Sequence, residues 1–137
     1  MIVLDCSAAT EIVRRTPRGK GFRSLMLEGE EVMSSELFQA EIRNVFWKYE
    51  HAGLIDHEQA EACVRAALGL VDAFVPLEEN ADEAFREASL HDHSVYDLFY
   101  LTLARRKAAT LFTADRKLAA LCEEMQVDCV AEHPLKE

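Results

Sequence analysis

Residues 93–115 read HSVYDLFYLTLARRKAATLFTAD, and this stretch decides the fold. From Val95 to Ala104 it is almost wholly apolar. That is too hydrophobic for a surface helix with one wet face, so we predict a buried helix over about 95–107. The run ATLFT at 109–113 follows and predicts a strand. Asp97 is anomalous in this setting, because burying an ionised and unpaired carboxylate costs several kcal/mol.

The same alternation of helix and strand extends along the rest of the chain. Short apolar runs predict further strands at 2–5, 30–35, 71–77 and 127–131. Helices are expected at about 7–15, 22–28, 36–53, 57–69, 80–90 and 115–125, with a break over residues 16–21. This alternation indicates an α/β fold in which a parallel sheet of about five strands lies between helical layers. No linker or repeat divides the chain, so we expect one domain over residues 1–137.

The composition is that of an ordinary soluble globular protein, with 50% hydrophobic and 29% charged residues. No segment is long and apolar enough to cross a bilayer, and the N-terminal MIVLD lacks the basic region of a signal peptide. We therefore expect a cytoplasmic protein with no membrane partner. The net charge of −10 argues against extensive non-specific contact with phosphates. A nucleic-acid role would need a local basic patch or a metal ion.

Two aspartates directly follow predicted strands. Asp5 ends the first strand, and Asp115 lies just past the strand at 109–113. In a parallel sheet both would lie at the carboxyl ends of the strands, where ligand sites form. Each residue alone also has an ordinary structural explanation, because aspartate before a helix is a favoured N-cap.

Asp97 has a structural explanation too, whereas Glu41 is harder to explain. Ser94-x-x-Asp97 matches a capping box, in which the acidic side chain returns to the N-cap amide. Glu41 lies in mid-helix, where no capping role exists. It falls within an apolar stripe formed by Leu37, Phe38, Ile42, Val45, Phe46 and Tyr49. The structural alternative is a stem packed on the core with the carboxylate reaching the surface.

Together the four carboxylates indicate a metal site. Asp5, Glu41, Asp97 and Asp115 would converge at one end of the sheet, where they raise one another's pKa values unless a cation lies among them. Oxygen ligands without His or Cys favour Mg²⁺ or Mn²⁺. Such an ion activates a water for in-line attack and stabilises the leaving oxygen, which is typical of phosphodiester hydrolysis.

The segments IVLDCSA, ELFQAEIRNVFWK and SVYDLFYLTLARRKAATLFTADRKLA, in this order, resemble a PIN-domain ribonuclease. They are most similar to the VapC-like toxins of bacterial and archaeal toxin–antitoxin pairs. The resemblance covers nearly the whole chain. It implies a three-layer α/β/α fold, Mg²⁺- or Mn²⁺-dependent endoribonuclease activity on RNA, inhibition by a cognate antitoxin and frequently a homodimer.

The resemblance also assigns individual residues. The acidic residues of the family fall on Asp5, Glu41, Asp97 and Asp115, and two supporting polar residues fall on Ser7 and Thr113. Many relatives carry a further acidic residue shortly after the last aspartate. Here Arg116, Lys117 and Leu118 follow it instead.

Basic residues near the expected site are candidates for contacts with RNA phosphates. These are Arg14, Arg15, Arg18, Lys20, Arg116 and Lys117. The cations at 105–107 are better explained by a helix C-terminus, where positive charge is favoured. HDH at 91–93 has the spacing of a metal-ligand cluster, but we favour solvated loop residues.

Two other function classes compete with a nuclease. A receiver-like signalling module also gathers carboxylates around Mg²⁺ at strand ends. The segment AFVPLEEN at 73–80 contains no aspartate to accept a phosphoryl group, which disfavours that interpretation. The second alternative is a non-catalytic PIN-like module used only for binding, and the intact set of four carboxylates disfavours it.

Overall fold

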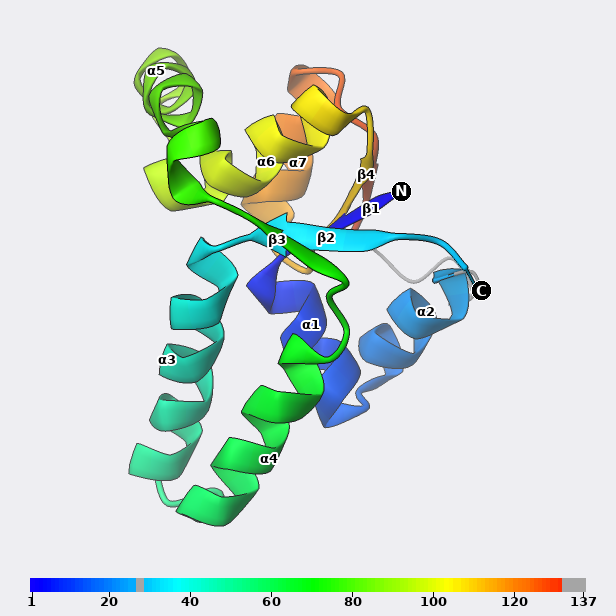
Figure 1. Ribbon diagram of the computed structural model, residues 1–137, viewed down its shortest axis with the longest axis vertical. Helices are drawn as coiled ribbons and strands as arrows, with labels where there is room; N and C mark the ends of the chain where they lie inside the picture. The colour runs from blue at the N-terminus through cyan, green and yellow to red at the C-terminus, as the bar shows by residue number, and fades with distance from the viewer. Residues whose placement is uncertain (27–28, 132–137) are drawn as a thin grey trace.

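The computed structural model describes residues 1–26 and 29–131 and contains a central parallel sheet (Figure 1). The strands are β1 (Ile2–Leu4), β2 (Val32–Ser35), β3 (Ala73–Val75), β4 (Thr110–Phe112) and β5 (Cys129–Val130). They lie in the order β3-β2-β1-β4-β5, and every neighbouring pair is parallel. The carboxyl ends of all strands therefore meet at one edge of the sheet, as the alternating pattern predicted.

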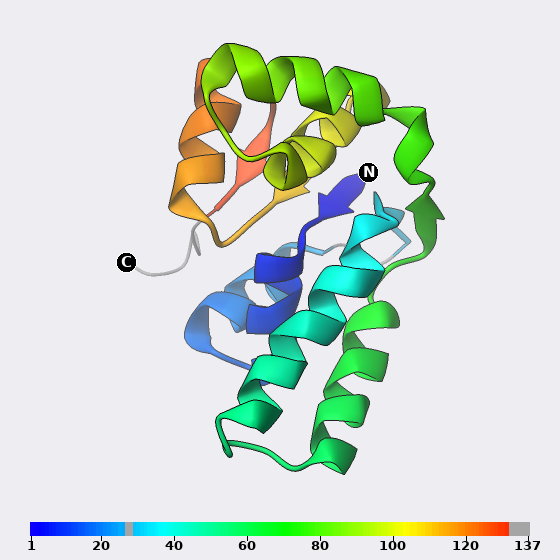
Figure 2. The ribbon, with the colours of Figure 1, turned by 90° about the vertical axis from the view of Figure 1, so that its left-hand side faces the viewer.

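Helices cover both faces of this sheet. They are α1 (Cys6–Arg14), α2 (Pro17–Leu25), α3 (Leu37–His51), α4 (His57–Leu68), α5 (Ala81–His91), α6 (Val95–Lys107) and α7 (Arg116–Glu124), with a 3₁₀ turn at Leu77–Glu79. Helices α1 to α4 lie on one side and α5 to α7 on the other (Figures 1 and 2). The predicted three-layer α/β/α fold is confirmed. None of the helices in the described ranges is both long and apolar enough to cross a membrane.

Helix α6 is largely buried from Leu98 to Ala104, as its sequence predicted. Its side chains at Leu98, Tyr100, Leu101, Leu103 and Ala104 are all at most 2% exposed. It contacts β1, β2 and β4 on one side and α5 on the other, so it needs an apolar surface nearly all round. Each buried leucine contributes about 1.5–3 kcal/mol through burial of apolar surface. This packing fixes the position of the first turn of α6, which carries Asp97.

The N-terminal half departs from the prediction at one point. Helix α2 begins at Pro17 and runs through Gly19 and Gly21, where we expected a break over residues 16–21. Thr16 caps the helix by accepting a hydrogen bond from the Gly19 amide, and proline suits the first helical position. Gly19 is required for close packing, because a Cβ there would lie 1.9 Å from the carbonyl oxygen of Glu11. The end of the predicted helix at 27–28 lies outside the described residues.

Candidate active site

An open cavity of about 530 Å³ lies where the strands end. It is lined by Asp5, Cys6, Ser7, Leu37, Ala40, Glu41, Asn44, Val45, Lys48, Tyr96, Asp97, Tyr100 and Asp115. We call it the carboxylate cavity, because it brings together all four acidic residues singled out in the sequence. They come from four separate places: the β1–α1 junction, α3, the first turn of α6, and the β4–α7 junction.

Asp5 is the most deeply buried of the four, with 4% of its surface exposed. Its Oδ1 atom accepts hydrogen bonds from the Ser7 hydroxyl at 2.8 Å and from the Ala8 amide at 2.9 Å, so Asp5 is also the N-cap of α1. Burial raises the pKa of Asp5 to about 6, and the nearby charge of Asp97 acts in the same direction. The N-cap explanation is therefore correct but does not account for the remaining oxygen.

Ser7 and Thr113 join the two strand ends into one polar network. The Ser7 hydroxyl lies 3.2 Å from the Thr113 hydroxyl and accepts a hydrogen bond from the Ala114 amide at 2.8 Å. Thr113 in turn accepts a hydrogen bond from the Asp115 amide at 3.0 Å. Asp115 caps α7 through the amides of Lys117 and Leu118. These bonds hold the two strand-end carboxylates in a fixed relation.

Asp97 does not form the capping box that its spacing suggested. Ser94 caps α6 by accepting a hydrogen bond from the Tyr96 amide at 3.2 Å, but the Asp97 carboxylate turns to His93 instead. Its Oδ2 atom lies 3.0 Å from His93 Nε2. Burial raises the pKa of Asp97, and Asp115 adds to the increase while the His93 hydrogen bond opposes it. The cap and the carboxylate therefore have separate roles.

Glu41 is half-buried and has one hydrogen-bond partner among the described residues. The Tyr100 hydroxyl donates a hydrogen bond to Glu41 Oε1 at 2.7 Å. Burial raises the pKa of Glu41, this hydrogen bond lowers it, and the charge of Asp97 raises it further. The carboxylate is thus held at the wall of the carboxylate cavity by a side chain of α6, and it does not extend from the core to bulk solvent.

Among the described residues, His93 is the one basic side chain that pairs with any of the four carboxylates. Within residues 1–26 and 29–131, no Lys or Arg nitrogen lies within 4.0 Å of any of their oxygens. Over the same residues, no three His, Cys, Asp or Glu side chains are close enough to ligate one ion directly. An all-oxygen set of this spacing fits Mg²⁺ or Mn²⁺ that keeps several of its waters, because these ions dehydrate reluctantly.

The family model for the PIN domain matches residues 2–124. The chain belongs to the PIN domain family. Within it the chain is VapC-like, since it is 32% identical to Ribonuclease VapC12 of Mycobacterium tuberculosis over 87% of this chain and 90% of that one. It is also 28% identical to Ribonuclease VapC3 of Pyrobaculum aerophilum, over 86% of this chain and 92% of that one.

A solved structure shares the fold of this VapC-like chain. VapBC2 from Rickettsia felis, bound to a DNA fragment from its promoter, matches with a TM-score of 0.71 and 15% identity. The match covers 96% of this chain and 99% of that one. Membership of the PIN family also disfavours the receiver-like alternative.

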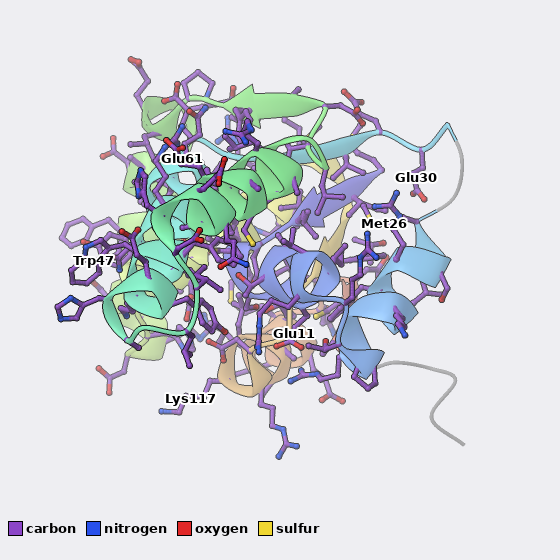
Figure 3. All side chains as sticks on the ribbon, turned by 90° about the horizontal axis from the view of Figure 1, so that it is seen from below. Glu11, Met26, Glu30, Trp47, Glu61 and Lys117 are labelled. Atoms are coloured by element: carbon purple, nitrogen blue, oxygen red, sulfur yellow. The ribbon has the colours of Figure 1, made fainter. Side chains whose placement is uncertain are left out.

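The six basic residues predicted to contact RNA do not lie together, and none lines the carboxylate cavity. Arg18 donates a hydrogen bond to the Ala114 carbonyl at 2.8 Å, so it supports the turn that carries Asp115. Arg14 lies 4.9 Å above the ring of Tyr49. Arg15 and Lys20 line a separate hollow between α1 and α2. Arg116 and Lys117 begin α7, and Lys117 projects outward from it (Figure 3).

The HDH segment is divided between three roles. His93 contacts Asp97, as described above, and Asp92 ends α5 in the left-handed conformation with φ of 52°. His91 lies 3.4 Å from Glu87 and 3.3 Å from Glu124. The two histidines are therefore half-buried and paired with carboxylates, and they are not the solvated loop residues that we favoured. His93 is a contact of the site that the sequence pattern alone did not assign.

Sequence reasoning also missed four polar or aromatic residues of the carboxylate cavity: Asn44, Lys48, Tyr96 and Tyr100. A signal for the first three exists. Asn44 and Lys48 stand three and seven residues after Glu41 and so share its helix face, and Tyr96 directly precedes Asp97.

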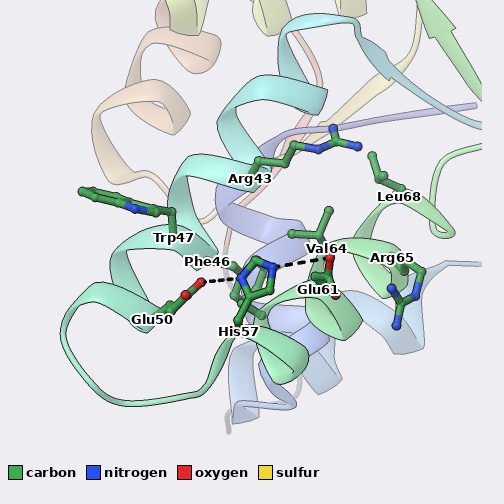
Figure 4. A pocket seen from close by; sticks show the side chains of 10 residues that line it. Arg43, Phe46, Trp47, Glu50, His57, Glu61, Val64, Arg65 and Leu68 are labelled. Carbon is green, nitrogen blue, oxygen red and sulfur yellow. Dashed lines mark hydrogen bonds and ion pairs between the residues drawn. The ribbon is translucent and has the colours of Figure 1, made fainter.

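A second hollow of about 410 Å³ lies between α3 and α4 (Figure 4). His57 there lies 3.0 Å from Glu50 and 3.4 Å from Glu61, and both glutamates raise its pKa. None of its lining residues belongs to the carboxylate cavity.

Proposed function

We propose that the chain is a single-domain, divalent-metal-dependent endoribonuclease, the toxin of a VapBC-type toxin–antitoxin pair. One observation carries the proposal: four half-buried or buried carboxylates from distant parts of a VapC-like PIN chain line a single open cavity, and no Lys or Arg of the described residues pairs with them. The named ribonuclease relatives support RNA as the substrate. The metal is Mg²⁺ or Mn²⁺, held by Asp5, Glu41, Asp97 and Asp115 directly or through water.

The chain orients these carboxylates before any substrate arrives. Ser7 and Ala8 fix one oxygen of Asp5, His93 fixes one oxygen of Asp97, and Tyr100 fixes one oxygen of Glu41. Among the described residues, Asp97 and Glu41 each keep the other oxygen for the ion or its water shell. When bound, the ion supplies a more acidic water and neutralises charge on the phosphate. The raised pKa values of Glu41 and Asp97 suit a carboxylate that accepts the proton of the attacking water.

RNA cleavage tests this proposal directly. The purified chain is incubated with single-stranded RNA in Mg²⁺ or Mn²⁺, with and without EDTA, and compared with Asp97→Asn. We expect cleavage by the wild type, loss with EDTA, and a decrease of about 10³-fold in the variant. Asp92→Asn is the matched control, because asparagine tolerates the left-handed conformation that Asp92 adopts. Equal cleavage by wild type and Asp97→Asn would remove Asp97 from the site.

The partners belong to the same proposal. We expect a cognate antitoxin, a homodimer and a cytoplasmic location without a membrane partner. The likeness to VapBC2 supports the antitoxin, and large exposed apolar side chains such as Trp47, Phe85 and Leu90 offer surface for protein contacts. Light scattering measures the oligomeric state. Co-expression with the product of the neighbouring reading frame tests whether a small protein binds the chain and stops RNA cleavage.

A further inference from the structure

One face of α3 extends the carboxylate cavity away from the sheet. Glu41, Asn44, Val45 and Lys48 are spaced as neighbours on a helix and all line the cavity. Val45 and Lys48 also line an adjoining hollow of about 320 Å³ together with Tyr49 and Leu54. The two hollows therefore adjoin one another along α3, and we call them together the α3 groove. Lys48 lies about 10 Å along the helix from Glu41, given a rise of about 1.5 Å per residue.

Lys48 carries the charge that a polyanion needs in this groove. Among the described residues that line the carboxylate cavity, it is the one Lys or Arg. No carboxylate in the described part of the chain lies within 4.0 Å of its ammonium group. The side chain is exposed, so its charge is available to a phosphate of a bound strand.

Tyr96 supplies an aromatic surface on the opposite wall. It is 60% exposed although it directly precedes the half-buried Asp97, so its ring is not part of the core. An exposed aromatic side chain beside a charged groove is the usual platform on which an unpaired base stacks. Asn44 lies between Glu41 and Lys48 and offers an amide for hydrogen bonds.

We propose that Asn44, Lys48 and Tyr96 form a binding groove for single-stranded RNA that runs from the four carboxylates along α3. Lys48 contacts a phosphate near the scissile one, and Tyr96 stacks on a base. The groove favours single strands, because a paired base has no free face for Tyr96. This inference rests on the proposed function and names how the substrate lies in that site.

Lys48→Met and Arg43→Met form a matched pair that tests the charge. Both remove one exposed cation from α3, but Arg43 faces the hollow between α3 and α4 (Figure 4). Cleavage of a labelled ten-nucleotide RNA is measured at several salt concentrations. We expect Lys48→Met to raise KM about tenfold with kcat within about twofold of the wild type, and to reduce the salt slope by about 0.7. Equal kinetics for the two variants would overturn the role of Lys48.

Tyr96→Phe and Tyr96→Leu test the stacking. We expect Tyr96→Phe to keep wild-type kcat/KM, because the ring remains, and Tyr96→Leu to lower it about tenfold through KM. Loss of activity in both variants, or in neither, would overturn stacking by this residue. If Tyr96 had only a structural role, Tyr96→Phe and Tyr96→Leu would not differ in KM.

RNA binding without cleavage separates this inference from the proposed function. Fluorescence anisotropy with the same RNA uses Asp97→Asn protein in Mg²⁺, with and without Lys48→Met. Weaker binding upon Lys48→Met supports the groove even if the wild type cleaves nothing, an outcome that would refute the nuclease alone. Absence of RNA binding in the protein that retains Lys48 would refute the groove.

Discussion

Two acidic regions of the molecule differ in how their charge is balanced. On the outer surface, Glu83 and Glu87 of α5 pair with Arg105 at 2.6 and 2.7 Å, and Glu83 also pairs with Arg106 at 3.1 Å. In the carboxylate cavity, four acids share no Lys or Arg within the described residues. The pKa of Glu83 is accordingly lowered by its arginines, whereas the pKa values of Asp5, Glu41 and Asp97 are raised.

The difference separates a structural use of charge from a functional one. The α5–α6 ion pairs neutralise the cations at the end of α6 and need no further partner. Exposed pairs of this kind are worth only about 0–1 kcal/mol each. In the carboxylate cavity the raised pKa values show an electrostatic cost in the isolated chain, which the proposed metal ion would offset. A cluster of acids that pairs with no Lys or Arg among the described residues is therefore the better indicator of function.

The largest effect is expected on RNA cleavage, which a substitution in the carboxylate cavity should lower and a substitution in the α5–α6 ion pairs should not. Glu41→Gln keeps the shape of the side chain and its bond from Tyr100, but removes a charge from the cavity. We expect RNA cleavage to fall by more than about 100-fold, measured as kcat/KM in Mg²⁺. Glu83→Gln is the control from the ion-pair region, and it should cleave at the wild-type rate with a loss of at most about 1 kcal/mol in stability. Equal activity of the two variants would contradict the functional difference between the carboxylate cavity and the α5–α6 ion pairs.

The second prediction concerns stability and pH. The pKa of Asp5 is about 6 in the folded chain against 3.8 ordinarily, so the folded state binds the extra proton between these values. The metal-free protein should therefore lose roughly 3 kcal/mol through Asp5 as pH rises from about 4 to 7. Asp5→Asn should remove this pH-dependent loss of stability. The free energy of unfolding of both proteins is measured in urea at each pH, and the difference between them gives the contribution of Asp5. A difference that stays constant with pH would contradict the burial of a titrating carboxylate.

A smaller effect is expected at His93, which pairs with Asp97. His93→Leu removes the hydrogen bond to Oδ2, and we expect about tenfold weaker Mn²⁺ binding and a similar loss of cleavage. His93→Gln retains an N–H donor and should recover most of the loss. If leucine and glutamine behave alike in a calorimetric Mn²⁺ titration, the hydrogen bond does not orient Asp97.

The smallest effect tests the cap that lies beside the site. Ser94→Ala removes the acceptor for the Tyr96 amide and should lower the free energy of unfolding by about 1 kcal/mol. Mn²⁺ affinity should remain unchanged, because Asp97 bonds to His93 and not to the cap. Urea unfolding and calorimetry on the same sample measure both quantities. A loss of metal affinity equal to that of His93→Leu would show that cap and carboxylate act together.

The sequence predicted the fold through its alternation of apolar runs and through the uniform hydrophobicity of α6. It misplaced the start of α2, because Gly19 was interpreted as a helix breaker. Gly19 instead allows α2 to approach the carbonyl of Glu11, a tertiary contact that no local pattern reveals.

The four carboxylates were also recognisable from sequence, since strand ends and helix faces can be located by periodicity. Their partners were harder to find. The spacing of Ser94 and Asp97 indicated a capping box, yet His93 lies within reach of Asp97 and takes that bond. Arg18 was predicted to contact RNA because of its charge. In the structure it donates a hydrogen bond to Ala114, and this bond depends on how α2 packs against the end of β4. Lys48 and Tyr96 can be recognised as residues of the site only when α3 and α6 are seen side by side around the carboxylate cavity.

The most direct test of the central claim is a calorimetric titration of Mn²⁺ into the wild type and Asp5→Asn at pH 7. The account predicts a saturable site in the wild type and at least about tenfold weaker binding in the variant, because a buried ligand is lost while its shape is kept. Equal Mn²⁺ affinity in the two proteins, or no binding to the wild type, would contradict a metal site in the carboxylate cavity.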